Sequence, residues 1–472
     1  MNRRHFLQLL VGTAIARQAS WPATSYAQSA PDQPGASAAQ PPLTWRNWSG
    51  SQSATPDLRR APASVSELQE LLTHPDYATA KIRPVGSGHS FSPLVPTNDI
   101  MVSLARLNGV LSHHDALCQA RVAAGSLLGQ LGQPLASIGQ AMFNMPDIDQ
   151  QSLGGLLATA THGTGAELMS LSGYIEGLTL VTPRGEVLEC SRSQYPDIFQ
   201  AAKVSLGCLG FVTDVTLQNA RPYRLKKTTD WQPIEDILDG ADTMAREHRN
   251  YEFYYIPFSG MGFTSTHNIT DEPISSSPTV DQNDGARDLQ KARDYLSWSP
   301  RLRRLILGGY MRTLSREVKV APSWQNYTSD RNVRFNEMEY HLPRENWQVA
   351  FREVMALVER QFPEVFFPFE VRFVKADDAW LSPFYRQDSV SIAVHRFFED
   401  DFRPLFAAVE PILRRHGGRP HWGKLNTLTG NDFQALYPKW QAFREVRDAL
   451  DPNGRFLNPY LAGLFTGHNA NG

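Results

Sequence analysis

The stretch Gly86-Ser-Gly-His-Ser-Phe-Ser92 contains two glycines one residue apart, followed directly by a histidine. It follows residues 81–85, a short run that predicts a strand. Its two glycines have no Cβ, so the backbone can turn tightly and approach a ligand closely, and consecutive N–H groups in such a turn can bind an anion. A Rossmann phosphate loop is ruled out, because that motif needs a third glycine that opens a helix, whereas Pro93 and Pro96 follow here.

A second informative stretch, residues 144–165, contains mostly small side chains from Ser152 to Gly165. A backbone this bare can lie directly against a flat ring and a pyrophosphate. It could also be a closely packed helix start. The stretch alone therefore leaves a binding role and a packing role open.

The composition is that of a soluble globular protein, with 41% hydrophobic and 20% charged residues. A length of 472 residues predicts two domains. The net charge of −2 argues against a nucleic-acid partner. Cys118, Cys190 and Cys208 are too few for a disulfide framework and lack metal-ligand spacing, so we expect no metal site.

The two glycine-rich stretches resemble the flavin-binding segments of the vanillyl-alcohol-oxidase/p-cresol-methylhydroxylase (PCMH) superfamily, and most closely those of the aldonolactone oxidases and alditol oxidases. In that family the loop histidine is joined to the 8α-methyl group of FAD, so the resemblance implies covalent FAD through His89. It further implies that the cofactor is bound by Gly86, Ser87, Gly88, His89, Ser90, Ser152, Gly155, Thr159, Thr161, His162, Gly163, Gly207, Gly210 and Val212.

The resemblance covers about residues 45–465 and implies an α+β fold. A PCMH-type FAD-binding domain of two subdomains, residues 45–220, would precede an α/β substrate (cap) domain, residues 221–465, with a large antiparallel sheet. The last segment of the chain would return to the flavin domain. We expect the polar residues 270–288 to form a mobile loop.

The N-terminus predicts export. Arg3-Arg4 begin a twin-arginine pattern, the apolar run 9–16 follows, and small residues before Gln28 predict a signal peptide 1–27 cleaved after Ala27. The apolar run is too short to span a bilayer and no later stretch is long enough, so we expect no stable membrane insertion. Residues 28–44 predict a disordered spacer. Twin-arginine export carries folded proteins, so a periplasmic or secreted protein loaded with its cofactor is expected.

Residues 366–374 alternate, which predicts a strand. One face is apolar and consists of Phe367, Phe369, Val371 and Phe373. Glu370 and Arg372 share the other face, about 7 Å apart. On their own they could form an ordinary surface ion pair. The segment resembles the Glu-x-Arg strand of aldonolactone and alditol oxidases, which implies that both residues meet the substrate.

Pro420-His-Trp-Gly-Lys424 resembles the other active-site strand of the family, and Lys424 matches its lysine. With a period of two, Trp422 and Lys424 are expected to share one face. A cationic Lys424 is disfavoured beside Arg372, which would make it a usable base. His395 matches a pocket histidine of the alditol oxidases, although a hydrogen-bonded core histidine remains open.

Two pocket positions bear on substrate and electron acceptor. Asp147 stands where the alditol oxidases have a serine, so the substrate is left open. Pro146 matches the position that controls oxygen access in the family, where glycine or proline accompanies oxidase activity.

The resemblance therefore implies an FAD-dependent oxidase that acts on a CH–OH group of a D-arabinono- or L-gulono-1,4-lactone and reduces O2 to H2O2. Lys424, Arg372, Glu370 and His395 are the expected catalytic residues. A polyol oxidase and a periplasmic dehydrogenase with a cytochrome or quinone acceptor, which would need an electron-acceptor partner, are the alternatives. A non-catalytic sugar-binding protein on the same scaffold is the alternative from another class.

Overall fold

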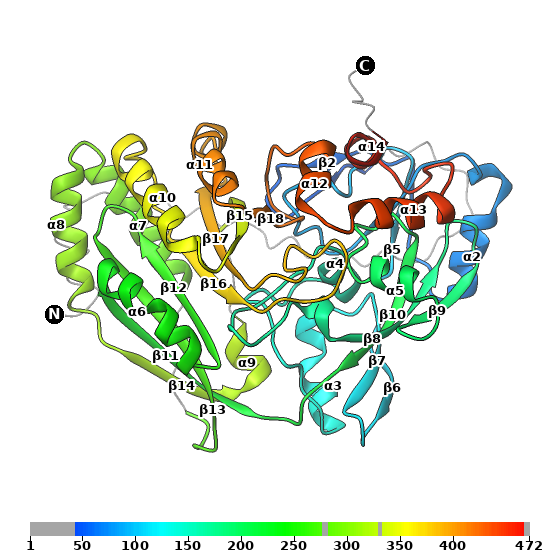
Figure 1. Cartoon of the computed structure of the whole chain (residues 1–472), viewed down its shortest axis with the longest axis horizontal. Helices are drawn as coiled ribbons and strands as arrows, with labels where there is room; N and C mark the ends of the chain where they lie inside the picture. The colour runs from blue at the N-terminus through cyan, green and yellow to red at the C-terminus, as the bar shows by residue number, and fades with distance from the viewer. Residues whose placement is uncertain (1–42, 276–281, 329–332, 467–472) are drawn as a thin grey trace. The chain divides into compact units, whose positions relative to one another are not determined.

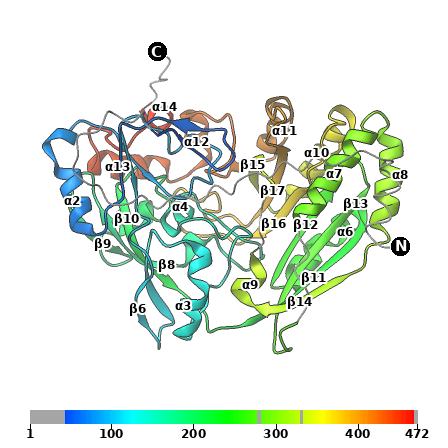
Figure 2. The ribbon, with the colours of Figure 1, turned by 180° about the vertical axis from the view of Figure 1, so that it is seen from behind.

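The computed structural model describes residues 43–275, 282–328 and 333–466, with only the backbone of 282–286. These residues belong to one compact unit, Pro42–Gly472. The predicted signal peptide and almost all of the predicted spacer lie outside the described residues. In this unit, an eight-stranded sheet lies on one side and two smaller sheets lie on the other (Figure 1), as the reverse view also shows (Figure 2).

The smallest of the three main sheets supports the histidine loop. It is parallel, in the order β3-β5-β4, and β4 leads directly into Gly86. The helix α2 begins after Ser64, whose side chain accepts a hydrogen bond from the Glu67 N–H, and it buries Leu68, Leu71 and Leu72 beside this sheet. The elements here are β1 (Trp45–Arg46), β2 (Ser53–Ala54), β3 (Leu58–Arg60), α2 (Val65–Thr73), η1 (Pro75–Tyr77), β4 (Ile82–Val85) and β5 (Ile100–Ser103).

The second sheet is antiparallel, in the order β6-β7-β10-β8-β9. Its hairpin β8–β9 turns at Gly185, whose φ of 81° favours glycine. The first part of the stretch of small residues from Ser152 to Gly165 forms the short helix α4. The elements are β6 (Val110–His114), β7 (Gln119–Ala123), η2 (Leu128–Gln130), α3 (Gly132–Ser137), α4 (Leu153–Ala158), η3 (Leu171–Tyr174), β8 (Ile175–Val181), β9 (Val187–Ser191), α5 (Pro196–Ala202) and β10 (Phe211–Gln218).

The third sheet is antiparallel, in the order β14-β11-β13-β12-β16-β17-β15-β18. The expected α+β fold with a large antiparallel sheet is confirmed. Its strands are β11 (Arg224–Pro233), β12 (Asn250–Ile256), β13 (Met261–Thr270), β14 (Glu317–Pro322), β15 (Phe335–Pro343), β16 (Phe369–Val374), β17 (Ser389–Phe397) and β18 (Arg419–Pro420).

α10 packs on the apolar face of this sheet, so that the opposite, polar face borders the pocket. Phe253 and Phe373 pack their rings against Trp347 of α10, whereas Glu370 and Arg372 point from β16 to the opposite side, as strand alternation requires. The helices are α6 (Ile234–Glu247), α7 (Gln282–Leu296), α8 (Pro300–Met311), α9 (Ser323–Tyr327), α10 (Trp347–Gln361) and α11 (Arg403–Arg415).

The expectation of a loop over residues 270–288 is wrong at its end, because residues 282–288 begin α7. The polar composition suggested a loop, but Leu289 and Ala292 farther along this helix pack against Ile256 and Met261 of the sheet. Residues 276–281 lie outside the described part of the chain. In that described part, no helix has the length and hydropathy that a membrane span requires.

The C-terminal helices α12 (Gly430–Leu436), α13 (Trp440–Leu450) and α14 (Pro459–Thr466) lie among the elements of the two smaller sheets (Figures 1 and 2). Arg83 of β4 fixes this arrangement. Its buried guanidinium donates hydrogen bonds of 2.5–3.0 Å to the carbonyl oxygens of Leu94, Leu206, Gly207 and Phe456. One side chain thus joins the strand before the histidine loop to two distant parts of the chain.

Candidate active site

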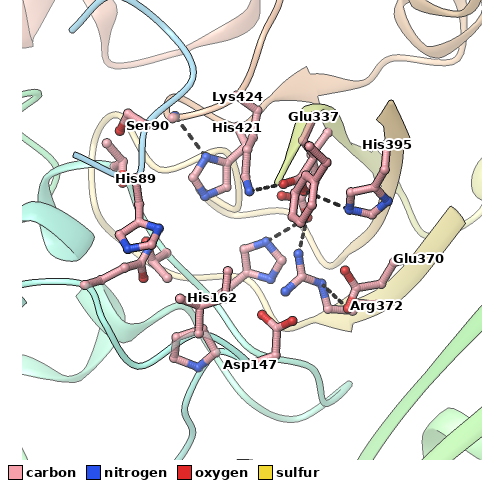
Figure 3. Close-up of a pocket in the computed structure, with 18 residues that line it drawn as sticks. His89, Ser90, Asp147, His162, Glu337, Glu370, Arg372, His395, His421 and Lys424 are labelled. Carbon is pink, nitrogen blue, oxygen red and sulfur yellow. Dashed lines mark hydrogen bonds and ion pairs between the residues drawn. The ribbon is translucent and has the colours of Figure 1, made fainter. Parts of the chain in front are cut away.

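One pocket between the sheets collects residues from many segments (Figure 3). It brings together nine of the residues predicted from the sequence: His89, Ser90, Thr159, Thr161, His162, Glu370, Arg372, His395 and Lys424. Asp147 and Pro146 also line it. The remaining lining residues are Ile148, Gln151, Phe335, Glu337, Glu339, His421 and Gly423. In the view of Figure 3, His89 and His395 lie on opposite sides of the pocket.

Nine residues predicted to bind the cofactor are not part of this lining: Gly86, Ser87, Gly88, Ser152, Gly155, Gly163, Gly207, Gly210 and Val212. Some of them pack against one another. A Cβ on Gly86 would lie 2.2 Å from Ser152 Oγ, so the histidine loop and the bare stretch touch. A Cβ on Gly210 would lie 2.3 Å from the carbonyl oxygen of Val181, so this glycine allows close strand packing.

The histidine loop is held from the N-terminal side by residues 47 and 48. The Trp48 N–H donates to the carbonyl of Gly88 at 2.8 Å, and the Trp48 ring stacks on the His89 ring with centroids 5.7 Å apart. Asn47 Nδ2 donates to the carbonyl of Ser90 at 3.0 Å. Gly88 has a φ of 71°, which explains the glycine there. No pattern in the sequence indicates the Trp48–His89 stack.

His89 is a neutral imidazole at neutral pH. Burial, together with the charge of Lys424, lowers its pKa from 6.5 to about 4. A neutral ring keeps a lone pair on one nitrogen, which a bond to carbon requires. The side chain therefore has the protonation state that covalent attachment needs.

Glu370 and Arg372 point into the pocket rather than to solvent, so the surface ion-pair alternative is wrong. Both are buried, and Tyr254 Oη donates to Glu370 Oε1 at 2.6 Å. Arg372 Nη2 donates to Glu339 Oε1 at 2.7 Å, and Arg372 Nε lies 3.7 Å from Glu370 Oε1. Burial works against the charge of Arg372, but Glu339 and Glu370 outweigh it and raise its pKa well above the usual value.

The expectation for residues 420–424 is wrong in detail, because β18 ends at Pro420 and a turn follows. The Lys424 N–H donates to the carbonyl of His421 at 2.9 Å. Trp422 is fully buried and stacks on Phe433, with ring centroids 4.4 Å apart. Lys424 lies on the pocket side with His421 and Gly423, so it does not share a face with Trp422.

This turn is bonded directly to the histidine loop. The Phe91 N–H donates to the carbonyl of Gly423 at 2.7 Å, and Ser92 Oγ donates to the carbonyl of Trp422 at 2.5 Å. Lys424 and His89 therefore come together although they are far apart in the sequence. The partner of Lys424 Nζ is the carboxylate of Glu337, not Arg372, so the expectation that Arg372 makes it a base does not fit its surroundings.

Sequence reasoning missed Glu337 and Glu339 of β15, which line the same pocket. Glu337 is labelled in Figure 3. Glu337 Oε1 lies 3.7 Å from His395 Nε2, and Glu339 Oε1 lies 3.1 Å from His162 Nε2. His395 Nδ1 donates to the carbonyl of Pro368 at 2.9 Å. The signal was present, because residues 336–341 alternate in the same way as β16.

His162, Glu339 and His341 place three potential metal-ligand atoms within 4.8 Å of one another. In the described part of the chain, His341 Nε2 and Glu339 Oε2 have no hydrogen-bond partner. Arg372 donates to the same carboxylate, however, and its positive charge opposes a cation there. We therefore interpret the cluster as support for Arg372.

The residues present fit a flavin. Thr161 Oγ1 and Gln151 Oε1 belong to residues that line the pocket, and both atoms are buried without a hydrogen-bond partner among the described residues. Bound FAD offers polar ring atoms and a pyrophosphate to such groups. His89 would hold its ring, and the glycine loop before His89 offers N–H groups to phosphate.

Comparisons with known proteins agree with this arrangement. A model of the D-arabinono-1,4-lactone oxidase family matches residues 215–464, and a model of an FAD-binding domain matches residues 56–191. An L-gulono-1,4-lactone dehydrogenase from Mycobacterium tuberculosis is 36% identical over 424 residues, which cover 88% of this chain and 97% of the relative. The chain belongs to the aldonolactone oxidoreductase family. The resemblance inferred from the glycine-rich stretches is thereby confirmed, and with it an FAD-linked oxidoreductase.

Other relatives of this aldonolactone oxidoreductase include the L-gulonolactone oxidase of Bos taurus, 32% identical over 437 residues that cover 90% of this chain and 98% of the relative. Among solved structures, a solvent-stable cholesterol oxidase superposes with a TM-score of 0.76 at 18% identity, covering 89% of this chain and 97% of that chain. A cholesterol oxidase from B. sterolicum gives 0.71 at 16% identity, covering 89% and 96%. At these identities the two structures show the fold alone.

Glu252 of β12, which faces Arg372 in the strand register, offers a test of the electrostatics. Burial, together with Glu370, raises its pKa from 4.5 to about 7. The folded state therefore holds this proton more tightly than the unfolded chain, so the free energy of unfolding falls as the pH rises from 4.5 to about 7. We expect Glu252→Gln to remove this fall, which is worth up to roughly 3 kcal/mol.

Urea unfolding of the two proteins across this pH range measures the difference. Glu247→Gln, at an exposed position of α6, is the control and should follow the wild-type pH dependence. Parallel curves for Glu252→Gln and the wild type would show that the Glu252 carboxyl is not perturbed.

Proposed function

We propose that this protein oxidises a CH–OH group of an aldono-1,4-lactone of the L-gulono or D-arabinono type, with FAD as cofactor and O2 as electron acceptor. The observation that carries the proposal is the convergence of Arg372, Lys424 and Glu370 in the pocket that also contains His89. The names of the relatives that cover nearly the whole chain support a lactone substrate.

The side chains of the pocket suit such a substrate. Bound FAD supplies the hydride acceptor. Arg372, a cation held by two carboxylates, stabilises negative charge that develops on the substrate oxygen. Lys424, paired with Glu337, takes the hydroxyl proton as it gives one of its own to that carboxylate, or it pairs with the alkoxide. Glu370, fixed by Tyr254, orients the remaining hydroxyl groups. His395 completes the polar wall.

The acceptor has two candidates. Pro146 lines the pocket, and the family resemblance associates proline there with oxidases, which favours O2. The relative with 36% identity is called a dehydrogenase, whereas the one with 32% identity is called an oxidase. A dehydrogenase that passes electrons to a cytochrome or quinone is therefore the second candidate. Asp147 at the pocket wall keeps alditols among the substrates to be tested.

Mixing the FAD-loaded protein without oxygen with L-gulono-1,4-lactone, D-arabinono-1,4-lactone and a set of alditols tests the function. We expect a lactone to bleach the flavin absorbance, and we expect Arg372→Ala to slow bleaching by about a hundredfold, because a preorganised charge is lost. Arg360→Ala, at an exposed position in the last turn of α10, should react like the wild type.

Readmission of air then separates the two acceptors. An oxidase returns to the oxidised spectrum rapidly and yields one H2O2 for each lactone consumed, whereas a dehydrogenase stays reduced until a cytochrome or quinone is added. If only alditols bleach the flavin, the substrate is an alditol and not a lactone. If none of the compounds bleaches it, the proposed activity is contradicted and a sugar-binding protein is favoured.

We further propose that FAD is attached covalently through His89, which is supported by its neutral ring and its fixed position against Trp48. Acid precipitation of the wild type should leave yellow protein, because a carbon–nitrogen bond survives denaturation. His89→Ala should release its flavin into the supernatant. Mass spectrometry of the peptide that contains His89 checks the site, and complete release from the wild type would refute the attachment.

We also propose that the protein is exported folded to the periplasm or secreted, on the pattern Arg3-Arg4 and the short apolar run behind it. Arg3→Lys with Arg4→Lys should leave flavin-loaded precursor in the cytoplasm, measured by fractionation and by the absence of a product that begins at Gln28. Arg17→Lys, beyond the pattern, is the control. Normal export of the double variant would reject this route.

A further inference from the structure

We propose that the two glutamates of β15 divide the support of the active site between them: Glu339 positions Arg372 and His162, and Glu337 connects Lys424 to His395 as a proton relay. The inference rests on the proposed function, because it names the groups that stand behind the residues expected to meet the substrate.

The geometry of β15 sets up this division. Glu337 and Glu339 are two residues apart on a strand, so their side chains leave on the same face. Glu337 is 3% exposed and Glu339 is 0% exposed. A carboxylate buried to this degree is stable only with charged or hydrogen-bonding partners, and removal of a partner is costly. Each glutamate has partners of its own, contributed by elements other than β15.

Glu339 fixes the direction of Arg372. Its Oε1 accepts from Arg372 Nη2 at 2.7 Å, whereas Glu370, a second carboxylate beside this guanidinium, is 3.7 Å from Nε. The same Oε1 lies 3.1 Å from His162 Nε2, and His162 Nδ1 donates to the carbonyl of Gly163 at 2.8 Å. Glu339 thereby ties β16 to the segment that follows α4, and it acts on the reaction only through the position of Arg372.

Glu337 has a different pair of partners. Its Oε2 contacts Lys424 Nζ, and its Oε1 is 3.7 Å from His395 Nε2. His395 Nδ1 donates to the carbonyl of Pro368, which fixes the tautomer whose Nε2 is an acceptor. An acceptor thus lies behind the carboxylate that holds Lys424. Catalytic hydrogen bonds are often long without substrate, so the 3.7 Å separation is compatible with transfer.

The relay moves one proton from the substrate to His395 through Lys424 and Glu337. The substrate hydroxyl gives its proton to Lys424 Nζ while Lys424 gives one of its own protons to Glu337 Oε2. Rotation of the carboxyl group then presents that proton to His395 Nε2. The substrate loses one proton, His395 gains one, and Lys424 and Glu337 end as they began. The electron pair of the substrate C–H bond leaves with the hydride, so the carbonyl product is neutral.

The two roles predict different kinetic changes. Glu339→Gln keeps the shape of the side chain but weakens the hold on Arg372, and a misplacement of about 1 Å can cost about a hundredfold in rate. We expect flavin reduction at saturating substrate to slow by about this factor, with a pH profile of unchanged shape. The test uses whichever lactone or alditol the wild type oxidises.

Glu337→Gln should slow the same step and also move the rising limb of the pH profile to lower pH. Removal of a carboxylate makes the neighbouring cations lose their protons more easily. The charged or titratable groups around Glu337 are Lys424, His395, Arg372 and Glu339, with His89 and His421 near Lys424. Glu337→Asp, which keeps the charge, should restore the wild-type profile.

Glu410→Gln is the matched control. Glu410 is a buried glutamate of α11 that accepts hydrogen bonds from Tyr340, on the other face of β15, and from Thr427. We expect it to lower the melting temperature without changing flavin reduction. The proposal is overturned if Glu339→Gln reacts within twofold of the wild type, or if Glu337→Gln keeps the wild-type pH profile.

Failure of the proposed function is recognised separately, because then no lactone or alditol bleaches the wild-type protein. Crystal structures of the glutamine variants still decide the positioning role in that case. The Arg372 guanidinium should move in Glu339→Gln and stay in place in Glu337→Gln. An unmoved Arg372 in Glu339→Gln would overturn the proposal without any measurement of activity.

Discussion

The buried guanidinium of Arg83 connects the strand before the histidine loop to the carbonyl oxygens of Leu94, Leu206, Gly207 and Phe456. Burial lowers its pKa only to about 10, so it remains charged, and it satisfies carbonyl oxygens in three separate parts of the chain. Each carbonyl left without a donor in such a place costs about 1–3 kcal/mol. Because Arg83 lies three residues before Gly86, these hydrogen bonds also fix the position of the end of β4, where the histidine loop begins.

The pocket depends in turn on a balance of buried charge. Arg372 and Lys424 are each matched by a carboxylate of β15, and the matching groups come from segments that are distant in sequence. Isolated buried charges would be expelled or neutralised, so the cations can stay charged beside a flavin only because this strand supplies their partners. The same balance explains why His89, beside a cation and without a carboxylate partner among the described residues, is neutral.

The parts of the fold and the site that depend on local periodicity could be predicted from the sequence. The alternation of residues 366–374 correctly placed Glu370 and Arg372 on one face, because the side-chain period of a strand is two. It could not show that this face is covered, since a strand facing a pocket and a strand facing solvent have the same pattern. The turn at residues 421–424 was not predictable either, because its shape comes from hydrogen bonds to the histidine loop. Glu337 and Glu339 were visible as an alternation, but only the fold shows which cations they meet.

The bonds between the histidine loop and the turn at residues 422–423 have a consequence for synthesis. A ribosome makes the loop when most of the chain, including its hydrogen-bonding partners, has not yet been translated. Phe456, the farthest partner of Arg83, is made 373 residues after it. The complete arrangement around the histidine loop therefore forms only after residue 456 has been made, because both ends of the folded region contribute to it.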